Sequence, residues 1–336
     1  MELKSLINQI ILPQSNEKVL ILVDEPHGEL KDSEAWLDRR TTWANEWKEG
    51  FLDLGITTVE IQCYKATGKN NGALPIEIMN LAKTKNIIIS MPQFSATAPL
   101  HEITDIEGSQ TRVVSMPGLN RQFETTFFEA DYSIVSKRAK KASILLDNAI
   151  KAKVIFSNKD EMIFDLRNRK AKADTGSCQN PGRLTNFPAG EAYKTLYEGV
   201  KDDNLGESKT EGVLPIMYNN RIVRLKVSQN KASTTDEEFK KWLDYPNRNN
   251  IAEFAIGVNY KGKRTGITLG DEKLQGAHIA LARSSHLGGK VDSDVHQDFI
   301  YAEDDELHIT KMTLIDSNEE EVNIIDEGKL QLGYLD

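Results

Sequence analysis

The feature that most constrains the fold is a change of pattern near residue 150 of the 336-residue chain. Before this point, short apolar runs alternate with stretches of helical periodicity. After it, short strand-like runs follow one another, and residues 236–243 form the one convincing helix. Alternating strands and helices are typical of a mostly parallel sheet covered on both faces, whereas consecutive strands are typical of strand-rich domains. We therefore expect an α/β fold, with an N-terminal α/β domain over residues 1–150 and a strand-rich α+β domain over residues 151–336.

The first half of the chain contains the elements of a parallel sheet and its covering helices. Apolar runs predict strands at 18–23, 57–61, 86–90 and 111–115, and helical periodicity predicts helices at 33–54, 75–83 and 124–152. Ser33 is expected to cap the first of these helices, because its hydroxyl can accept from free backbone amides. Trp36, Trp43 and Trp47 recur at helical spacing, which indicates core packing.

The loop after the first strand carries no nucleotide-binding motif. It reads Asp24-Glu-Pro-His-Gly28, which contains neither G-x-G-x-x-G nor the P-loop pattern. Asp24, Glu25 and His27 lie at the carboxyl end of a predicted strand, where open α/β sheets bind ligands. A solvated loop is the alternative for these residues.

The second half reads as a series of short strands joined by loops rich in Gly, Asn and Asp. The predicted strands are 154–156, 162–164, 213–217, 222–227, 254–258, 299–301 and 308–314. The polar segment 158–160 separates the first two, which predicts a β-hairpin.

Composition argues against several classes of partner and site. Acidic residues outnumber basic ones by 51 to 42, giving a net charge of -9, which argues against binding to nucleic acid or to an anionic membrane. The longest apolar runs are far shorter than the ~20 residues of a membrane span. The two cysteines, Cys63 and Cys178, are expected to be reduced thiols, with a single disulfide as the alternative. We expect a cytoplasmic protein that acts on a small molecule or a short peptide.

The main chemical signal is the segment Asp294-Val-His-Gln-Asp298. In an extended strand side chains alternate between faces, so His296 and Asp298 point the same way, with Cα atoms about 6.5–7 Å apart. An imidazole and a carboxylate at this spacing can reach a common metal, and His278, flanked by small residues, is the best third ligand. Such a set suits half of a two-metal hydrolase or a facial triad for non-haem iron. A surface pair is the alternative.

Two glutamates add to this signal. Pro188 and Gly190 favour a turn that directs the carboxylate of Glu191 inward. Glu253 is a single carboxylate inside an apolar strand, where an unpaired charge costs several kcal/mol, so it needs a cation, a metal or a proton. The alternative for Glu253 is a paired or edge-exposed carboxylate.

Two further histidines are rival ligands. They are His286 and His308, and for each the alternative is a structural role.

The chain resembles the metallo-aminopeptidases of the aminopeptidase T and aminopeptidase S type, together with their wider relatives. The blocks that carry the resemblance lie in the family's order over residues 186–300, with a further block at 112–118 and a long helix at 123–148. They are Asn186-Phe-Pro-Ala-Gly-Glu191, Ile251-Ala-Glu-Phe-Ala-Ile-Gly-Val-Asn259, Gly270-Asp-Glu-Lys-Leu-Gln-Gly-Ala-His-Ile-Ala280, Gly288-Gly289 and His296-Gln-Asp298.

The resemblance implies a pair of divalent metals, Zn, Co or Mn, in the C-terminal domain. The matching ligands are Glu191, Glu253, His278, His296 and Asp298, and Glu191 or Glu253 would bridge the metals. The implied activity is hydrolysis of an N-terminal aminoacyl amide by metal-activated water, with Glu191 and Glu253 as the catalytic carboxylates. The resemblance also implies a homodimer.

Two departures from the family pattern bear on the activity. The true aminopeptidases place a tyrosine shortly after the histidine that matches His278, whereas this chain reads Leu281-Ala-Arg-Ser-Ser-His286, so Arg283, Ser284 or another residue would have to stabilise the oxyanion. The Pro-Ala-Gly-Glu block is commoner in the wider relatives.

One of these relatives is the dihydroxypyridine dioxygenase, which suggests an alternative. In this alternative one Fe(II) is held by His278, His296 and Asp298, and it cleaves a hydroxylated aromatic ring. A third possibility is a catalytically silent protein that binds metal or a small ligand.

Overall fold

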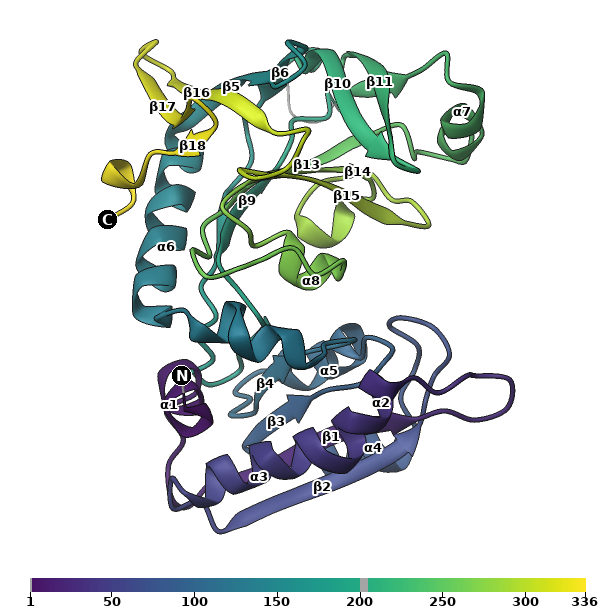
Figure 1. Cartoon of the computed structure of the whole chain (residues 1–336), viewed down its shortest axis with the longest axis vertical. Helices are drawn as coiled ribbons and strands as arrows, with labels where there is room; N and C mark the ends of the chain where they lie inside the picture. The colour runs from purple at the N-terminus through teal and green to yellow at the C-terminus, as the bar shows by residue number, and fades with distance from the viewer. Residues whose placement is uncertain (1, 200–204) are drawn as a thin grey trace. The chain divides into compact units, whose positions relative to one another are not determined.

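The computed structural model of the chain describes residues 2–199 and 205–336. The described chain divides into two compact units, each built from non-contiguous segments (Figure 1). Unit 1 comprises residues 1–133, 176–189 and 261–270, and unit 2 comprises residues 134–175, 190–260 and 271–336. The expected boundary near residue 150 stays a prediction about domain organisation.

Unit 1 contains a five-stranded, fully parallel sheet. Its strands, in spatial order, are β2 (Thr58–Lys65), β1 (Lys18–Glu25), β3 (Ile87–Ser90), β4 (Arg112–Ser115) and β8 (Leu184–Asn186). The four strands predicted from the first half are confirmed, and the fifth comes from a later segment. The central strands are buried on both faces, which is why they read as continuous apolar runs.

Helices cover this sheet. They are α1 (Leu3–Ile10), α2 (Glu34–Asp38), α3 (Ala44–Leu52), α4 (Ile76–Ala82) and α5 (Thr97–Thr104), and a π-helical turn (Arg39–Trp43) joins α2 to α3. Ile78 of α4 and Leu100 of α5 pack against Leu20, Ile88 and Val113 of the sheet. The Ser33 cap is confirmed, because its side chain accepts a hydrogen bond from the backbone amide of Trp36 at 3.2 Å.

Unit 2 contains two antiparallel sheets. The larger sheet runs, in spatial order, β12 (Lys231–Ser233), β11 (Arg221–Ser228), β10 (Glu211–Tyr218), β6 (Glu161–Asp165), β5 (Ala149–Phe156), β16 (Ile309–Asp316), β17 (Glu321–Asp326) and β18 (Lys329–Leu330). The smaller sheet runs β15 (His296–Ala302), β14 (Gly276–Ala282), β13 (Ile251–Gly257), β9 (Glu191–Thr195) and β7 (Lys172–Asp174). The expected α/β and strand-rich parts of the fold are therefore both present.

An apolar core lies between the two sheets of unit 2. Phe164 and Leu214 of the larger sheet share this core with Phe254 and Ile279 of the smaller sheet. The helices of this unit are α6 (Tyr132–Asn148), which adds Leu146 to the core, and α7 (Glu237–Leu243). Helix α8 (Thr268–Asp271) belongs to unit 1 except for its last residue. One face of the smaller sheet thus packs in the core, and its other face is available for polar side chains.

The helix predicted over 124–152 is wrong at both ends. Residues Arg121–Thr125 and Phe127–Glu129 form 3-10 turns, and α6 begins only at Tyr132. At the other end, residues after Asn148 enter β5, because Ala152 pairs with Leu314 of β16. Strand pairing here overrides a helical local pattern.

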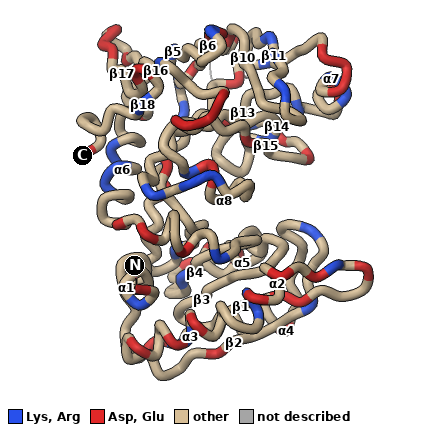
Figure 2. The backbone as a smooth tube through the Cα atoms, in the orientation of Figure 1, with Lys and Arg blue, Asp and Glu red and all other residues tan. Residues whose placement is uncertain are grey.

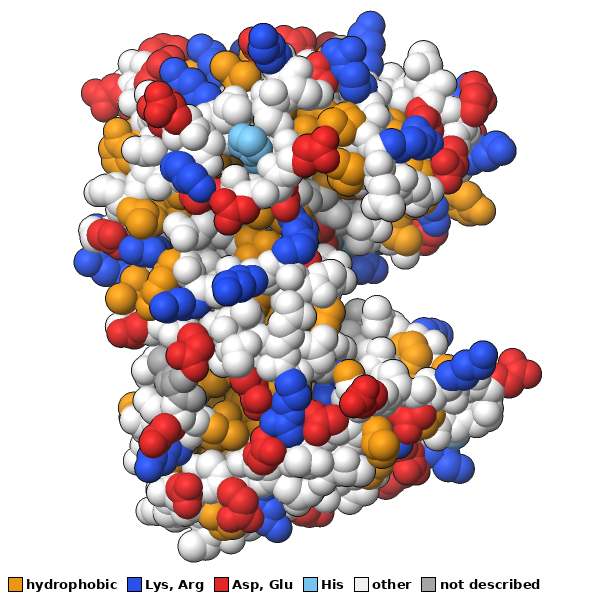
Figure 3. Space-filling model, viewed as in Figure 1, with side chains coloured by type: hydrophobic (Ala, Val, Ile, Leu, Met, Phe, Trp, Pro, Cys, Tyr) orange, Lys and Arg blue, Asp and Glu red, His pale blue; other side chains and the backbone are white. Residues whose placement is uncertain are grey.

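Charged side chains of both signs are interspersed along the chain. In Figure 2 helix α7 carries acidic residues in its first turn and basic residues in its last turn, an arrangement that complements the helix dipole. The face seen in Figure 3 likewise mixes Lys and Arg, Asp and Glu, and hydrophobic side chains. Among the described residues, no helix combines the length and apolar character needed to cross a membrane.

Candidate metal centre

The strand register of the smaller sheet places all five predicted ligands on one face. Glu253 of β13 lies opposite Ala280 of β14, and Ala280 lies opposite Asp298 of β15. His278 and His296 are two residues from these positions on their own strands, so alternation puts both on the same face. Glu191 pairs with Gly257, four residues along β13 from Glu253, and therefore joins the same face.

Residues between these positions explain why this face can hold a polar cluster. Phe254, Ile279 and Phe299 alternate with the candidate ligands and point into the core of unit 2. On the face of the cluster, Gly257 and Ala280 have side chains too small to fill the space between the carboxylates and imidazoles.

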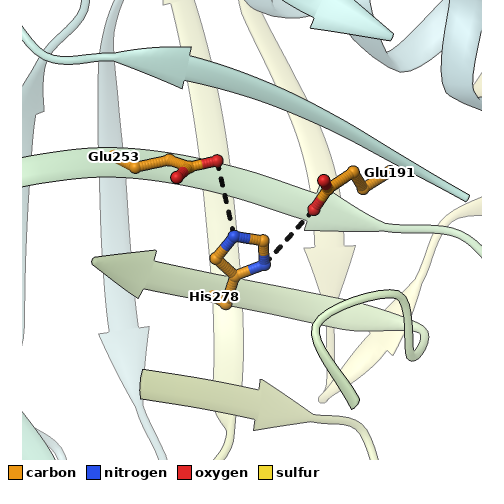
Figure 4. A group of neighbouring side chains, drawn as sticks. All are labelled: Glu191, Glu253 and His278. Atoms are coloured by element: carbon orange, nitrogen blue, oxygen red, sulfur yellow. Dashed lines mark ion pairs between the residues drawn. The ribbon is translucent and has the colours of Figure 1, made fainter. Parts of the chain in front are cut away.

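Two groups of potential ligand atoms share Glu253. In each group the atoms lie within 4.8 Å of one another; the first group is Glu191, Glu253 and His278, and the second is Glu253, His296 and Asp298. Figure 4 shows His278 between the two glutamates, with one ring nitrogen toward each. Glu253 Oε1 is 3.5 Å from His278 Nε2, and its Oε2 is 3.0 Å from His296 Nε2. Each oxygen of Glu253 therefore faces a different imidazole.

The carboxylate of Asp298 also lies near the Nε2 atoms of both histidines. Asp298 Oδ1 lies 3.2 Å from His296 Nε2 and 4.0 Å from His278 Nε2. His278 Nδ1 is 3.2 Å from the carbonyl of Glu272, and His296 Nδ1 is 2.6 Å from the carbonyl of Arg283. Because a carbonyl only accepts, the short contact of His296 Nδ1 puts hydrogen on that atom and leaves Nε2 of the neutral ring to ligate. His278 Nδ1 faces both the Glu272 carbonyl and Glu191 Oε2, which is 3.6 Å away.

The cluster is buried and strongly anionic. Glu191, Glu253 and His278 are 6%, 4% and 1% exposed. Burial by itself disfavours charged imidazoles, yet the neighbouring carboxylates raise the pKa of His278 to about 10 and that of His296 to about 11. Burial also opposes the charged carboxylates, but the two imidazoles outweigh it and lower the pKa of Glu253 and of Asp298. The carboxylates thus stay ionised and demand positive charge, which protons or a metal can supply.

A lysine extends the cluster beyond the predicted residues. Lys273 Nζ lies 2.5 Å from Glu191 Oε1, 2.8 Å from a carboxylate oxygen of Glu272 and 3.2 Å from a carboxylate oxygen of Asp174. The other oxygen of Glu191, Oε2, is buried without a hydrogen-bond partner. The His278 ring faces this oxygen with Nδ1 3.6 Å away, which is beyond hydrogen-bond distance, so the residues present suit a divalent metal.

Comparisons with known proteins identify solved structures with a similar fold but no sequence family. No family model and no curated protein matches the chain. A solved structure titled 2,5-dihydroxypyridine dioxygenase from Pseudomonas putida KT2440 matches with a TM-score of 0.68 and 13% identity, over 98% of this chain and 96% of that chain. Wild-type AmpT from Thermus thermophilus matches with a TM-score of 0.61 and 14% identity, over 98% and 99%. At this identity the likeness shows a shared fold.

The rival candidates lie outside both ligand groups, although His286 contacts one of their members. Asp24 is buried, and its carboxylate accepts from the Trp36 indole and the backbone amide of Gln93, each at 2.7 Å, which is a structural role. His308 Nδ1 lies 2.8 Å from the carbonyl of Asp305. His286 is exposed, and its ring lies edge-on against that of His296, with centroids 4.8 Å apart.

Sequence reasoning missed four residues on this side of the molecule. Lys273, Asp174 and Glu272 extend the cluster beyond the five predicted residues. Tyr193 lies two residues after Glu191 and opposite Ala255, the partner of His278, so it shares the face of the cluster. Burial and the nearby carboxylates raise the pKa of Tyr193, which keeps its hydroxyl protonated. Alternation along β9 was the available signal for Tyr193.

Proposed function

We propose that this chain is a divalent-metal-dependent hydrolase that removes the N-terminal residue from a short peptide or an aminoacyl amide. The observation that carries the proposal is the pair of ligand groups that share Glu253. Each group offers two carboxylates and one imidazole: Glu191, Glu253 and His278 in the first, and Glu253, Asp298 and His296 in the second. Carboxylate and imidazole ligands suit a divalent ion, so two adjacent groups suit a pair of ions.

Within this proposal each residue has a defined task. Glu191 and His278 would hold one ion and His296 and Asp298 the other, and Glu253 belongs to both ligand groups because its oxygens face different imidazoles. When bound, such a pair of ions supplies hydroxide near neutral pH and polarises a carbonyl. A free α-amine is a nitrogen ligand of the kind that imidazole provides, which suits a peptide N-terminus as substrate.

The chain lacks the tyrosine that the aminopeptidases place shortly after the histidine matching His278. We assign the role of that tyrosine, donation of a hydrogen bond to the oxyanion, to Tyr193. Ser284 is already committed, because its hydroxyl donates to Glu198. The protonated phenol of Tyr193 lies on the face of the cluster, in the strand row that contains His278. Removing one donor to a developing oxyanion costs about 10²–10³ in kcat. Tyr193→Phe is therefore expected to lower kcat by about that factor while the metal content stays unchanged, and an unchanged kcat would remove Tyr193 from this role.

A second candidate is an Fe(II)-dependent ring-cleaving dioxygenase. The observation that favours it is the set His278, His296 and Asp298, in which both Nε2 atoms lie within 4.0 Å of Asp298 Oδ1. Two imidazoles and one carboxylate are the ligands of a facial triad, which leaves positions for substrate and O₂. One of the structures that share the fold is described as a dioxygenase.

An assay under argon separates the two candidates. With Zn, Mn or Co and an aminoacyl amide, the hydrolase releases the amino acid without oxygen, because water is its only co-substrate. Chelation is expected to lower this rate by more than ~100-fold, on the scale of losses seen when metal binding is weakened. Oxygen uptake with Fe(II) and a hydroxylated aromatic ring, without amino-acid release, would replace the first candidate with the second.

A further inference from the structure

Lys273 lies at a fixed place between three carboxylates of unit 2. Its side chain is 2% exposed and pairs with Asp174 of β7, Glu191 of β9 and the adjacent Glu272. Asp174 and Glu191 are register partners of neighbouring strands, so their carboxylates lie on the same side of the sheet. The ammonium joins these two strands to the segment that follows α8.

The backbone around Lys273 is also held in place, by contacts with Asn259 and with β13. The carbonyl of Lys273 accepts from the backbone amide of Asn259 at 2.9 Å. A side chain at Gly257 would place its Cβ 1.9 Å from the carbonyl oxygen of Leu274, so only glycine admits this segment against β13. These contacts fix the backbone of Lys273, and the three ion pairs fix its ammonium.

The pairing fixes the orientation of the Glu191 carboxylate. Oε1 accepts from Lys273 Nζ at 2.5 Å, whereas Oε2 has no hydrogen-bond partner and lies 3.6 Å from His278 Nδ1 (Figure 4 shows this side of the carboxylate). Ligating carboxylates are commonly hydrogen-bonded through their other oxygen, and the loss of such partners costs about 10–100-fold in metal affinity.

We propose that Lys273 is a positioning residue that holds Glu191 by one oxygen and directs the other at a metal ion. Asp174 and Glu272 keep the ammonium in place, because each lies within ion-pair distance of Lys273 Nζ. This inference rests on the proposed two-ion centre and adds the residue that prepares one half of it.

Two other roles for Lys273 make different predictions. A lysine that only compensates buried charge affects stability and leaves the number of bound ions unchanged. A lysine that takes the place of one metal ion leaves a single ion in the native protein, and its removal raises the number to two. A positioning lysine gives two ions in the native protein and one after its removal.

Elemental analysis after dialysis against Zn²⁺ or Co²⁺ distinguishes these roles. We expect two ions per chain for the native protein and one for Lys273→Met, which keeps the apolar stem and removes the donor. Lys273→Arg restores a donor and is expected to recover part of the second ion's occupancy. The matched control is Lys194→Met: Lys194 is a buried lysine of the same strand as Glu191, but it donates to the backbone carbonyls of Leu146 and Ala149. This control is expected to keep two ions.

Asp174→Asn keeps the test decisive if Lys273→Met does not fold. It removes one of the carboxylates that hold the ammonium without touching Glu191, and it is expected to weaken the second ion about 10–100-fold. Two tightly held ions in both Lys273→Met and Asp174→Asn would overturn the positioning role alone. A native protein that binds a single ion would overturn the two-ion centre of the proposed function as well.

Discussion

Replacing Glu253 by glutamine is expected to weaken both metal ions, each by about 100-fold or more, and to reduce turnover at least as much. Glu253 is the residue shared by the two ligand groups, and each of its oxygens faces a different imidazole. Glutamine keeps the shape of the side chain but removes the charge and presents an amide nitrogen to one group, and metal binding needs the deprotonated ligand. Metal content and turnover of the dialysed protein measure the effect.

The control for this change is Glu211→Gln. Glu211 is an exposed residue of β10 and lies outside both ligand groups, so its replacement should leave metal content and activity unchanged. Far-ultraviolet circular dichroism of both variants checks that the fold survives. Native metal content in a folded Glu253→Gln protein would remove Glu253 from the centre.

Replacing His296 by alanine is expected to remove one ion and to abolish measurable hydrolysis. His296 Nε2 lies 3.0 Å from Glu253 and 3.2 Å from Asp298, so the second group is left with two carboxylates and no nitrogen ligand. The His278 group keeps all of its ligands, so about half of the metal should remain. The dependence of metal content on free Zn²⁺ concentration shows whether one ion or both are lost.

His308→Ala is the matched control for His296→Ala. His308 is another histidine of unit 2, and its ring contacts the backbone carbonyl of Asp305 and no candidate ligand. This variant should bind both ions with native affinity. If the two histidine variants behaved alike, His296 would not be a ligand.

The sequence predicted the elements whose local pattern and tertiary role agree. The strand at 18–23 is apolar from residue 19 onward because both of its faces are buried there, and the capped helix after Ser33 begins where its hydroxyl can satisfy a backbone amide. Helices α1 and α5 were not predicted. Within the region predicted as one helix, a π-helical turn places buried Arg39 where its guanidinium donates to the carbonyl of Leu119 and to Gln93. A long-range contact of this kind leaves no periodic signal.

The candidate site was predictable within one strand but not across strands. Alternation correctly places His296 and Asp298 on one face of β15, because their spacing is local. The position of Lys273 against Glu191 depends on the pairing of β7 with β9 and on the packing of residue 274 against Gly257. Strand register and close backbone contacts arise between segments far apart in the sequence, so the sequence of one segment does not predict them.

The measurement that most directly tests the two-ion centre is anomalous X-ray diffraction at the zinc or cobalt edge, from crystals soaked in that metal. We expect two peaks in unit 2, with ligand distances of about 2.0–2.2 Å. One peak should lie beside Glu191, Glu253 and His278, and the other beside Glu253, His296 and Asp298. Metal confined to exposed side chains, with no peak near the Nε2 atoms of His278 and His296, would contradict the account.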